Sequence, residues 1–193
     1  MGKCVNLADI DANVACAEFD NLAGIIDDVI YGYWDDVASW PTLPEGTENS
    51  PLTLAAAGKW VGNVVMKPGT RAYKLRMTDQ TGVLTMTDQG DVGGESVQYQ
   101  LDFVRSKISE TILGFMNATR GRKLFFIVTD KNGKKYLLGD SLNGAVKVAG
   151  DAATTGTVPT DRNGVPLRFT YACPRNLVYD GDVVNILTAQ QSQ

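Results

Sequence analysis

The sequence predicts a mainly β fold: an antiparallel β-sandwich or barrel with one flanking α-helix and an extended N-terminal arm. Apolar and polar residues alternate over several segments after residue 70, which is the period of a half-buried strand. Short turns with Asn-Gly separate some of these segments, as between antiparallel strands. Only one segment, 106–120, has a clear helical period.

The 193 residues are enough for one domain with a proper core. We expect a single domain over 1–193, in which an acidic segment and a proline-rich arm (1–60) precede a β core with its helix (61–193). Residues 1–40 hold eight acidic residues against one lysine, while the whole chain has a net charge of −4. Such an acidic field disfavours binding to nucleic acid phosphates, and no cluster of Arg and Lys with interleaved aromatic residues stands out to override it.

The N-terminal part has the weakest pattern. Segment 14–38 has apolar residues at roughly helical spacing and predicts a helix or a broken helix, although Gly24 and Gly32 interrupt it. Segment 39–60 has three of the seven prolines and no period, which predicts an extended loop or arm. No apolar run is long enough for a membrane span, and the N-terminus has no signal-peptide pattern, so we expect production in a cytoplasm.

Three segments between the arm and the helix predict strands. Tyr73, Leu75 and Met77 alternate with polar residues, 81–90 forms a second short strand, and a third strand covers 96–104. In the third, we expect one buried face made of Val97, Tyr99, Leu101 and Phe103.

The predicted helix at 106–120 has a complete set of helix signals. Ser106 can cap its first turn, Glu110 lies near its N-terminus, and Gly121 stands where a C-terminal cap belongs. Its apolar stripe, which we expect to lie on a sheet, consists of Ile108, Ile112, Leu113, Phe115 and Met116.

The rest of the chain predicts further strands joined by turns. Segments 123–130, 134–139, 144–148 and 165–173 are β-like, and 177–187 adds one more strand. The buried face of 165–173 should consist of Val165, Leu167, Phe169, Tyr171 and Cys173. The pentapeptide Thr-Asp-x-Asn-Gly occurs at 129–133 and again at 160–164, and its chemistry predicts two hairpin turns.

The sequence gives no sign of catalysis. It has no histidine, the commonest general base and zinc ligand, and it has neither a nucleophile motif nor a phosphate-binding loop. We therefore expect no enzyme activity, no cofactor and no metal. The three cysteines show no C-x-x-C spacing, and we expect them to be reduced and buried.

Tryptophans and turns are the candidate contact residues. Trp40 and Trp60 lie at the borders of the proline-rich stretch and Trp34 lies in the acidic segment, so at least two should lie outside the β core. Large aromatic residues on arms mark contact with a partner more often than local packing, which remains the alternative. The expected subunit-interface residues are Trp34, Trp40, Pro41, Pro44, Trp60, Asn132, Gly133, Asn163 and Gly164.

Two stretches carry a family resemblance: "GRKLFFIVTDKNGKKYLLGDSLNGAVKV" (121–148) and "ATTGTVPTDRNGVPLRFTYACP" (153–174). Their order is similar to that of tail-tube and related tail proteins of tailed bacteriophages. The resemblance implies a tail-tube-like β-sandwich or barrel flanked by a helix. It also implies rings of six copies that stack into a hollow tube through which DNA passes.

The expected function is therefore a structural virion protein that self-assembles into stacked, hexameric rings of a phage tail tube. Its partners would be further copies of itself and other tail proteins, with DNA only as passing cargo without specific binding and with no membrane. Its place would be the virion tail, assembled in the host cytoplasm. Two alternatives remain: a non-catalytic β-sandwich module that binds a glycan or a host-surface protein, and a tail terminator or head–tail connector protein.

Overall fold

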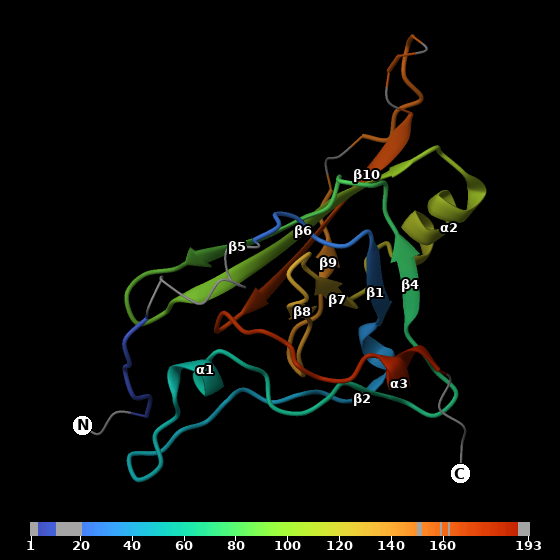
Figure 1. Cartoon of the computed structure of the whole chain (residues 1–193). Helices are drawn as coiled ribbons and strands as arrows, with labels where there is room; N and C mark the ends of the chain where they lie inside the picture. The colour runs from blue at the N-terminus through green and yellow to red at the C-terminus, as the bar shows by residue number, and fades with distance from the viewer. Residues whose placement is uncertain (1–3, 11–20, 150–151, 159, 162, 189–193) are drawn as a thin grey trace.

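Strands dominate the computed structural model, which describes residues 4–10, 21–149, 152–158, 160–161 and 163–188 (Figure 1). One antiparallel sheet has the order β4-β1-β7-β8 and is called the β7 sheet. Its strands are β1 (Asp28–Tyr33), β4 (Tyr73–Arg76), β7 (Leu124–Thr129) and β8 (Lys135–Leu138).

A second antiparallel sheet, called the β6 sheet, has the order β5-β6-β10-β9. It contains β5 (Val83–Gln89), β6 (Ser96–Ser106), β9 (Val146–Lys147) and β10 (Gly164–Cys173). A small pair, β2 (Val37–Ser39) and β3 (Val65–Met66), makes a third antiparallel sheet. The mainly β, antiparallel fold that the sequence predicts is confirmed.

The two large sheets pack face to face. Along β6 and β10 the inward side chains are those that the alternation predicts, and all of them are buried. In β7, the ring of Phe126 lies 4.6 Å from that of Phe169 in β10, which joins the two sheets at the centre of the core. The prediction of one wet and one buried face is confirmed for these two strands.

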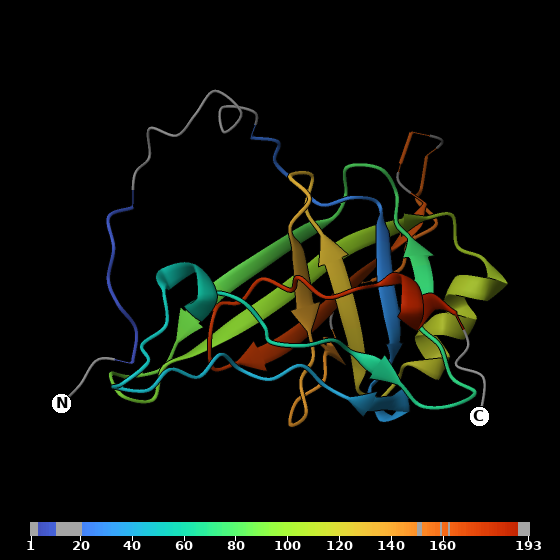
Figure 2. The ribbon, with the colours of Figure 1, turned by 60° about the horizontal axis from the view of Figure 1, so that its bottom comes forward.

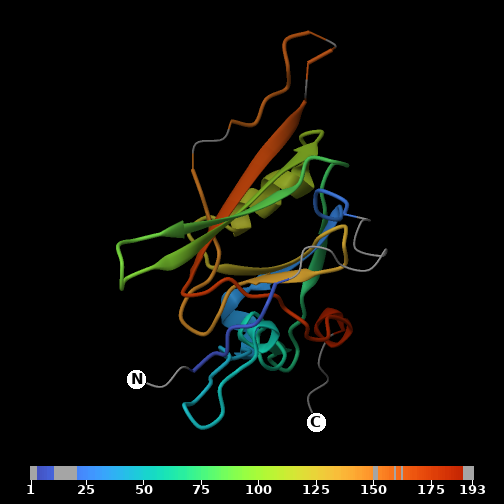
Figure 3. The same cartoon turned by 60° about the vertical axis from the view of Figure 1, so that its left-hand side comes forward.

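A third layer covers the other face of the β7 sheet (Figure 3). It consists of β2, β3, α1 (Leu54–Ala57), α3 (Val184–Leu187) and the segments between them (Figure 2). Leu124 to Val128 are all buried, because β7 is covered on both of its faces. Trp40 packs edge-to-face on Phe125 at 5.8 Å between ring centres, and Trp60 belongs to the core.

The prediction of an extended loop at 39–60 is confirmed, apart from the short helix α1, but the segment is not a free arm: it is part of the covering layer. Pro41 and Pro44 are buried, and the Arg175 guanidinium donates a 2.7 Å hydrogen bond to the carbonyl oxygen of Pro44. The segment lacks a period because single apolar side chains from an irregular backbone do the covering. Such side chains give no strand or helix pattern.

The predicted helix is present but shorter. The helix α2 (Glu110–Ala118) has Ser109 as its N-cap, whose hydroxyl accepts a bond from the amide of Ile112, rather than Ser106. Ser106 stays in β6, where it pairs with Gly164. Gly121, with φ of 69°, stands just after the helix as predicted, and Phe115 packs α2 against the ring of Phe169.

Two further predictions near the chain ends are wrong. Residues 21–38 form no α-helix: the chain enters β1, passes through the 3-10 turn η2 (Trp34–Asp36) and continues into β2, while residues 14–20 lie outside the described residues. Between its neighbours β4 and β7, β1 satisfies its backbone in a sheet, and this tertiary pairing outweighs the weak helical spacing. Segment 177–187 makes only single bridges at Val178 and Tyr179 before α3 begins.

Cys173 is buried as expected and burial raises the pKa of its thiol, whereas Cys4 is exposed, which corrects the prediction for that residue. Cys16 lies outside the described residues. In the part of the chain that the structure describes, no helix is long and apolar enough to cross a membrane.

Candidate functional site

The first Thr-Asp-x-Asn-Gly sequence is the tight turn between β7 and β8, as predicted. The Oδ1 atom of Asp130 accepts bonds from the amides of Asn132 at 3.0 Å and Lys134 at 2.7 Å. Gly133 has φ of 82°, a conformation that costs glycine little. The amide group of Asn132 binds the chain itself: its Oδ1 accepts from the amide of Leu22 at 2.9 Å, and its Nδ2 donates to the carbonyl of Leu22 at 3.2 Å.

The second copy also lies where the chain turns back, since Thr154 and Gly164 form an antiparallel bridge, but it is part of a longer loop and differs in geometry from the first copy. Asp161 reaches back, and its Oδ2 accepts from the amides of Val158 and Thr157, which lowers the pKa of its carboxyl. Asn163 accepts from the amide of Lys107 at 2.9 Å through its carbonyl oxygen. Gly164 already begins β10. The pentapeptide therefore belongs to a long loop between β9 and β10 that projects from the sandwich (Figure 1).

The tryptophans are packed within the chain. Trp34 and Trp40 stack with ring centres 6.1 Å apart, and the indole nitrogen of Trp34 donates a 2.7 Å bond to the carbonyl of Asp140. Trp60 is only 6% exposed, so the prediction that at least two tryptophans lie outside the core is wrong for Trp60. Trp40 is partly buried against the core. Local packing, the alternative left open by the sequence, accounts for these contacts.

Strand β5 presents the most open surface of the two large sheets. Among the described residues it pairs only with β6, so its outer edge has no backbone partner. Val83 is 47% exposed and Met86 is 36% exposed, although Met86 stands opposite the buried Tyr99 on β6. The β5–β6 hairpin extends past β7 and β8 (Figure 1), yet the inward Val97 and Tyr99 of β6 are buried there, so the exposure is limited to β5.

Beside this strand lies a hollow of about 260 Å³. Leu22, Val83 and Met86 border it together with Asp130 and Asn132 of the first turn. We call the exposed side chains of Leu22, Val83 and Met86, together with the free edge of β5, the β5 surface. An exposed strand edge with apolar side chains is a template for pairing with another chain. The sequence alone does not predict this surface, because the order of strands in the sheet decides which strand has a free edge.

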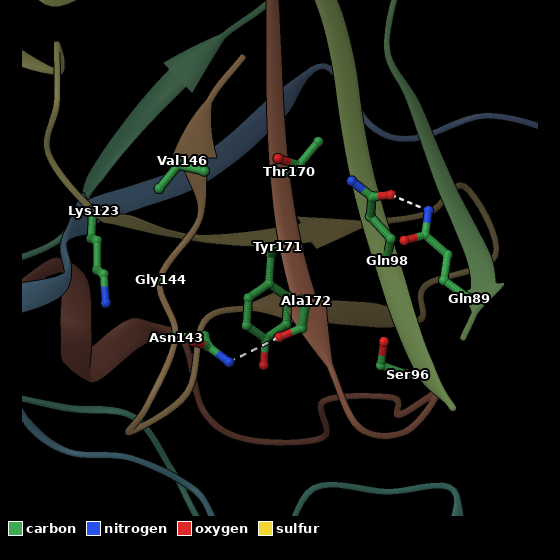
Figure 4. A pocket seen from close by; sticks show the side chains of 10 residues that line it. All are labelled: Gln89, Ser96, Gln98, Lys123, Asn143, Gly144, Val146, Thr170, Tyr171 and Ala172. Atoms are coloured by element: carbon green, nitrogen blue, oxygen red, sulfur yellow. Dashed lines mark hydrogen bonds between the residues drawn. The ribbon is translucent and has the colours of Figure 1, made fainter. Parts of the chain in front are cut away.

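A second hollow, of about 320 Å³, lies over the outer face of the β6 sheet near β9 (Figure 4). Amides and hydroxyls gather around it: Gln89 donates to Gln98, Asn143 donates to the carbonyl of Ala172 at 3.4 Å, and Thr170 stands between them. Lys123, the residue before strand β7, also borders this hollow. No carboxylate side chain lines the hollow. We call it the amide hollow.

A buried carboxylate fixes the loop that borders the amide hollow. Asp140 is 8% exposed, and its Oδ1 accepts from the amides of Leu142 and Asn143, both at 2.7 Å. Its Oδ2 accepts from the hydroxyl of Tyr171 at 2.7 Å. Every oxygen of this carboxylate is satisfied by the chain, so Asp140 has a structural explanation.

The described residues contain no group of three or more Cys, Asp or Glu side chains placed to hold a metal ion. No protein-family model, curated protein or solved structure matches the chain. What the chain does is therefore inferred from its own residues and geometry.

Proposed function

We propose that this chain is a structural protein that self-assembles through the β5 surface, and that the assembly is the ring of a bacteriophage tail tube. The observation that carries this proposal is the free edge of β5, a seven-residue strand with exposed apolar side chains. A strand of a second copy would satisfy the open N–H and C=O groups and would cover Val83 and Met86.

Two other features support an assembling protein. The β9–β10 loop projects from one end of the sandwich and presents Val158, which is 53% exposed. The tip of the β5–β6 hairpin presents Val92, which is 97% exposed. Projections of this kind are suited to contacts between stacked rings, and a tail terminator or head–tail connector would use them in the same way.

The test is electron microscopy of the concentrated protein together with its mass in solution. The proposal expects rings or tubes of uniform width, and it expects Met86→Lys to abolish them. An inward-pointing charge on an edge strand blocks pairing with another strand. The proposal is overturned if the wild-type chain stays monomeric at all concentrations.

Val92→Lys is the matched control, because it adds the same charge to an exposed valine of the same hairpin but outside β5. It should leave the width and formation of single rings unchanged. If both variants block rings to the same extent, net charge rather than the β5 edge governs assembly, and the assignment of the β5 surface is wrong.

The amide hollow favours a second candidate function, a module that binds a neutral glycan. Its amide and hydroxyl side chains can exchange hydrogen bonds with sugar hydroxyls, and no carboxylate lines it. In this case the chain would stay monomeric and would be retained on a sugar column. Gln98→Ala should then release it, whereas Met86→Lys should not.

A further inference from the structure

A groove runs along α2 on the side that faces β4 and β1. Two hollows of about 330 Å³ and about 290 Å³ share Tyr31, Thr111 and Phe115 in their linings, so they adjoin, and we treat them together as one groove with two halves. Its lining comes mainly from α2 on one side and from β1 and β4 on the other. Figure 1 shows α2 beside β4, the edge strand of the β7 sheet. We call this the α2 groove.

One half of the α2 groove is aromatic. Tyr31, Tyr33 and Tyr73 line it together with Phe115. Tyr31 lies edge-to-face with Phe115 at 5.3 Å and tilted against Tyr73 at 6.0 Å between ring centres. Tyr73 is 44% exposed, so part of its ring is free to meet a ligand. The absence of a side chain at Gly114, where an added Cβ would meet nothing within 4 Å, helps to leave this half open.

The other half is cationic. Lys74, Arg76 and Arg105 line it, all three are exposed, and within the described residues none of them has an ion-pair partner. Asp28 stands in register with Arg76 and Glu110 begins α2, yet neither forms an ion pair with these cations. No Asp or Glu lines either half of the groove.

Two more arginines extend the positive charge over the aromatic half. The guanidinium of Arg71 lies 5.0 Å from the ring centre of Tyr73, and that of Arg122 lies 5.4 Å from the ring centre of Tyr33. Five cations thus line or flank a groove that contains four aromatic rings, in a chain whose net charge is −4. The net charge of the chain does not show this local excess of positive charge, because the acidic residues of 1–40 outweigh it.

From this arrangement we propose that the α2 groove binds single-stranded nucleic acid. Aromatic rings on which bases stack, inside a groove whose cations contact the phosphates, are the features by which proteins hold single strands without sequence preference. A duplex would offer phosphates to the cations but no free base faces to the tyrosines. The proposal goes beyond self-assembly, since it concerns a different face of the molecule.

The lining also argues against an acidic glycan as the occupant. No amide or carboxylate side chain lines the groove, so few groups can exchange directional hydrogen bonds with sugar hydroxyls. Two of the three Ser and Thr hydroxyls are already used: that of Thr119 donates to the carbonyl of Phe115, and that of Ser109 accepts from the amide of Ile112.

A short stretch of the sequence indicates this site, although the net charge of the chain does not. Residues 71–76 read Arg-Ala-Tyr-Lys-Leu-Arg, so three basic residues and a tyrosine lie in β4 or directly before it. The expectation that no cluster of basic and aromatic residues occurs is therefore corrected. Arg105 and Phe115 join this cluster only through the fold, because they lie at the end of β6 and on α2.

The test is fluorescence anisotropy of a labelled oligothymidine of about 12 nucleotides, titrated with the full chain. The proposal expects binding that weakens roughly 20-fold between about 50 and 200 mM salt, if three phosphates are contacted. Tyr73→Ala should raise Kd roughly tenfold without changing the salt dependence, because it removes stacking alone. Arg76→Gln with Arg105→Gln should raise Kd and also lower the salt slope by about 1.4.

Lys131→Gln with Lys134→Gln is the matched control, since it removes two exposed charges at the β7–β8 turn, away from the groove. It should leave Kd within about twofold of the wild type, because most of the screened interaction is local. All replaced side chains are exposed, so each variant should keep the wild-type melting curve.

Three results would overturn the proposal: no binding at low salt, equal affinity for a duplex of the same length, or an equal loss in the control pair. Displacement of the oligothymidine by oligogalacturonate at equal charge would also overturn it, in favour of an acidic glycan. None of these readouts requires assembly, so the proposal can fail while rings form, and it can hold in a chain that forms none.

Discussion

The hydroxyl of Tyr171 donates a 2.7 Å hydrogen bond to Oδ2 of Asp140 inside the protein. Tyr171 belongs to β10 of the β6 sheet, and Asp140 follows β8 of the β7 sheet, so this bond joins the two halves of the sandwich. The indole of Trp34 also binds the carbonyl oxygen of Asp140. One aspartate thus connects both sheets to η2, the turn that leads into the covering layer.

Tyr171→Phe should lower the free energy of unfolding by about 1–3 kcal/mol, because it leaves a buried carboxylate oxygen without its donor. Urea unfolding followed by circular dichroism measures the change. Tyr136→Phe is the control: its hydroxyl also donates to an aspartate, Asp130, but at 3.4 Å and in a half-buried position. A cost for Tyr136→Phe as large as that for Tyr171→Phe would show that the buried bond has no special weight.

Alkaline pH should unfold the protein through its buried tyrosines. Burial raises the pKa of Tyr99 to about 12, and burial also raises the pKa of Tyr171 and Tyr179. In the unfolded chain tyrosines have a pKa of about 10. Because the native state keeps the proton longer, its stability is fully present below about pH 10 and is lost as pH rises toward 12 and beyond.

The measurement is denaturant unfolding between about pH 8 and 12, with the ultraviolet absorbance of tyrosinate as a second readout. Above pH 10, each protected tyrosine should lower the free energy of unfolding by up to about 1.4 kcal/mol per pH unit. The tyrosinate signal of the protected groups should appear only when the protein unfolds. A complete tyrosinate signal in protein that is still folded at pH 11 would contradict this.

Strong alternation made the core strands predictable. In β6 and β10, five inward residues of one strand face the inward residues of the other over a continuous register, and a slip of one residue would expose all of them. The pattern therefore determined both the strands and their buried faces. The turn at Asp130 was predictable for a similar reason, since its hydrogen bonds are local.

The covering layer and the candidate sites could not be predicted in this way. Trp60 and Pro44 are buried by contacts with residues far away in the chain, and nothing in their own segment signals it. The free edge of β5 results from the order of strands in the β6 sheet. The α2 groove forms because the fold brings Arg105 of β6 next to β4. The two Thr-Asp-x-Asn-Gly copies differ because Asp161 finds its partners in the preceding loop.

Asn132→Ala should release residues 21 and 22 from the β7–β8 turn while leaving the sandwich folded. The amide of Leu22 loses its acceptor, so its hydrogen exchange should speed up toward the rate of an open amide. The amide of Ile26 is an internal control, because it donates to the carbonyl of Thr129 and not to the replaced side chain. Equal acceleration at both amides would mean that the whole turn opens, contrary to this prediction.

Trp60→Ala should destabilise the monomer by about 3–5 kcal/mol, because it removes a large, almost fully buried side chain from the layer over the β7 sheet. Val61→Ala is the matched control next to it: Val61 is 54% exposed, and its loss should change the free energy of unfolding by less than about 0.5 kcal/mol. Both values come from urea unfolding at a concentration where the chain is monomeric.

This pair of variants also separates the two interpretations of the tryptophans. If Trp60 packs within its own chain, Trp60→Ala weakens the monomer whether or not rings form, and deletion of 42–58 should leave no stably folded monomer. If instead Trp60→Ala leaves the monomer as stable as the wild type and only prevents rings, the residue belongs to a subunit interface. The buried position of Trp60 and the 3.0 Å bond from its amide to the carbonyl of Val178 favour the first outcome.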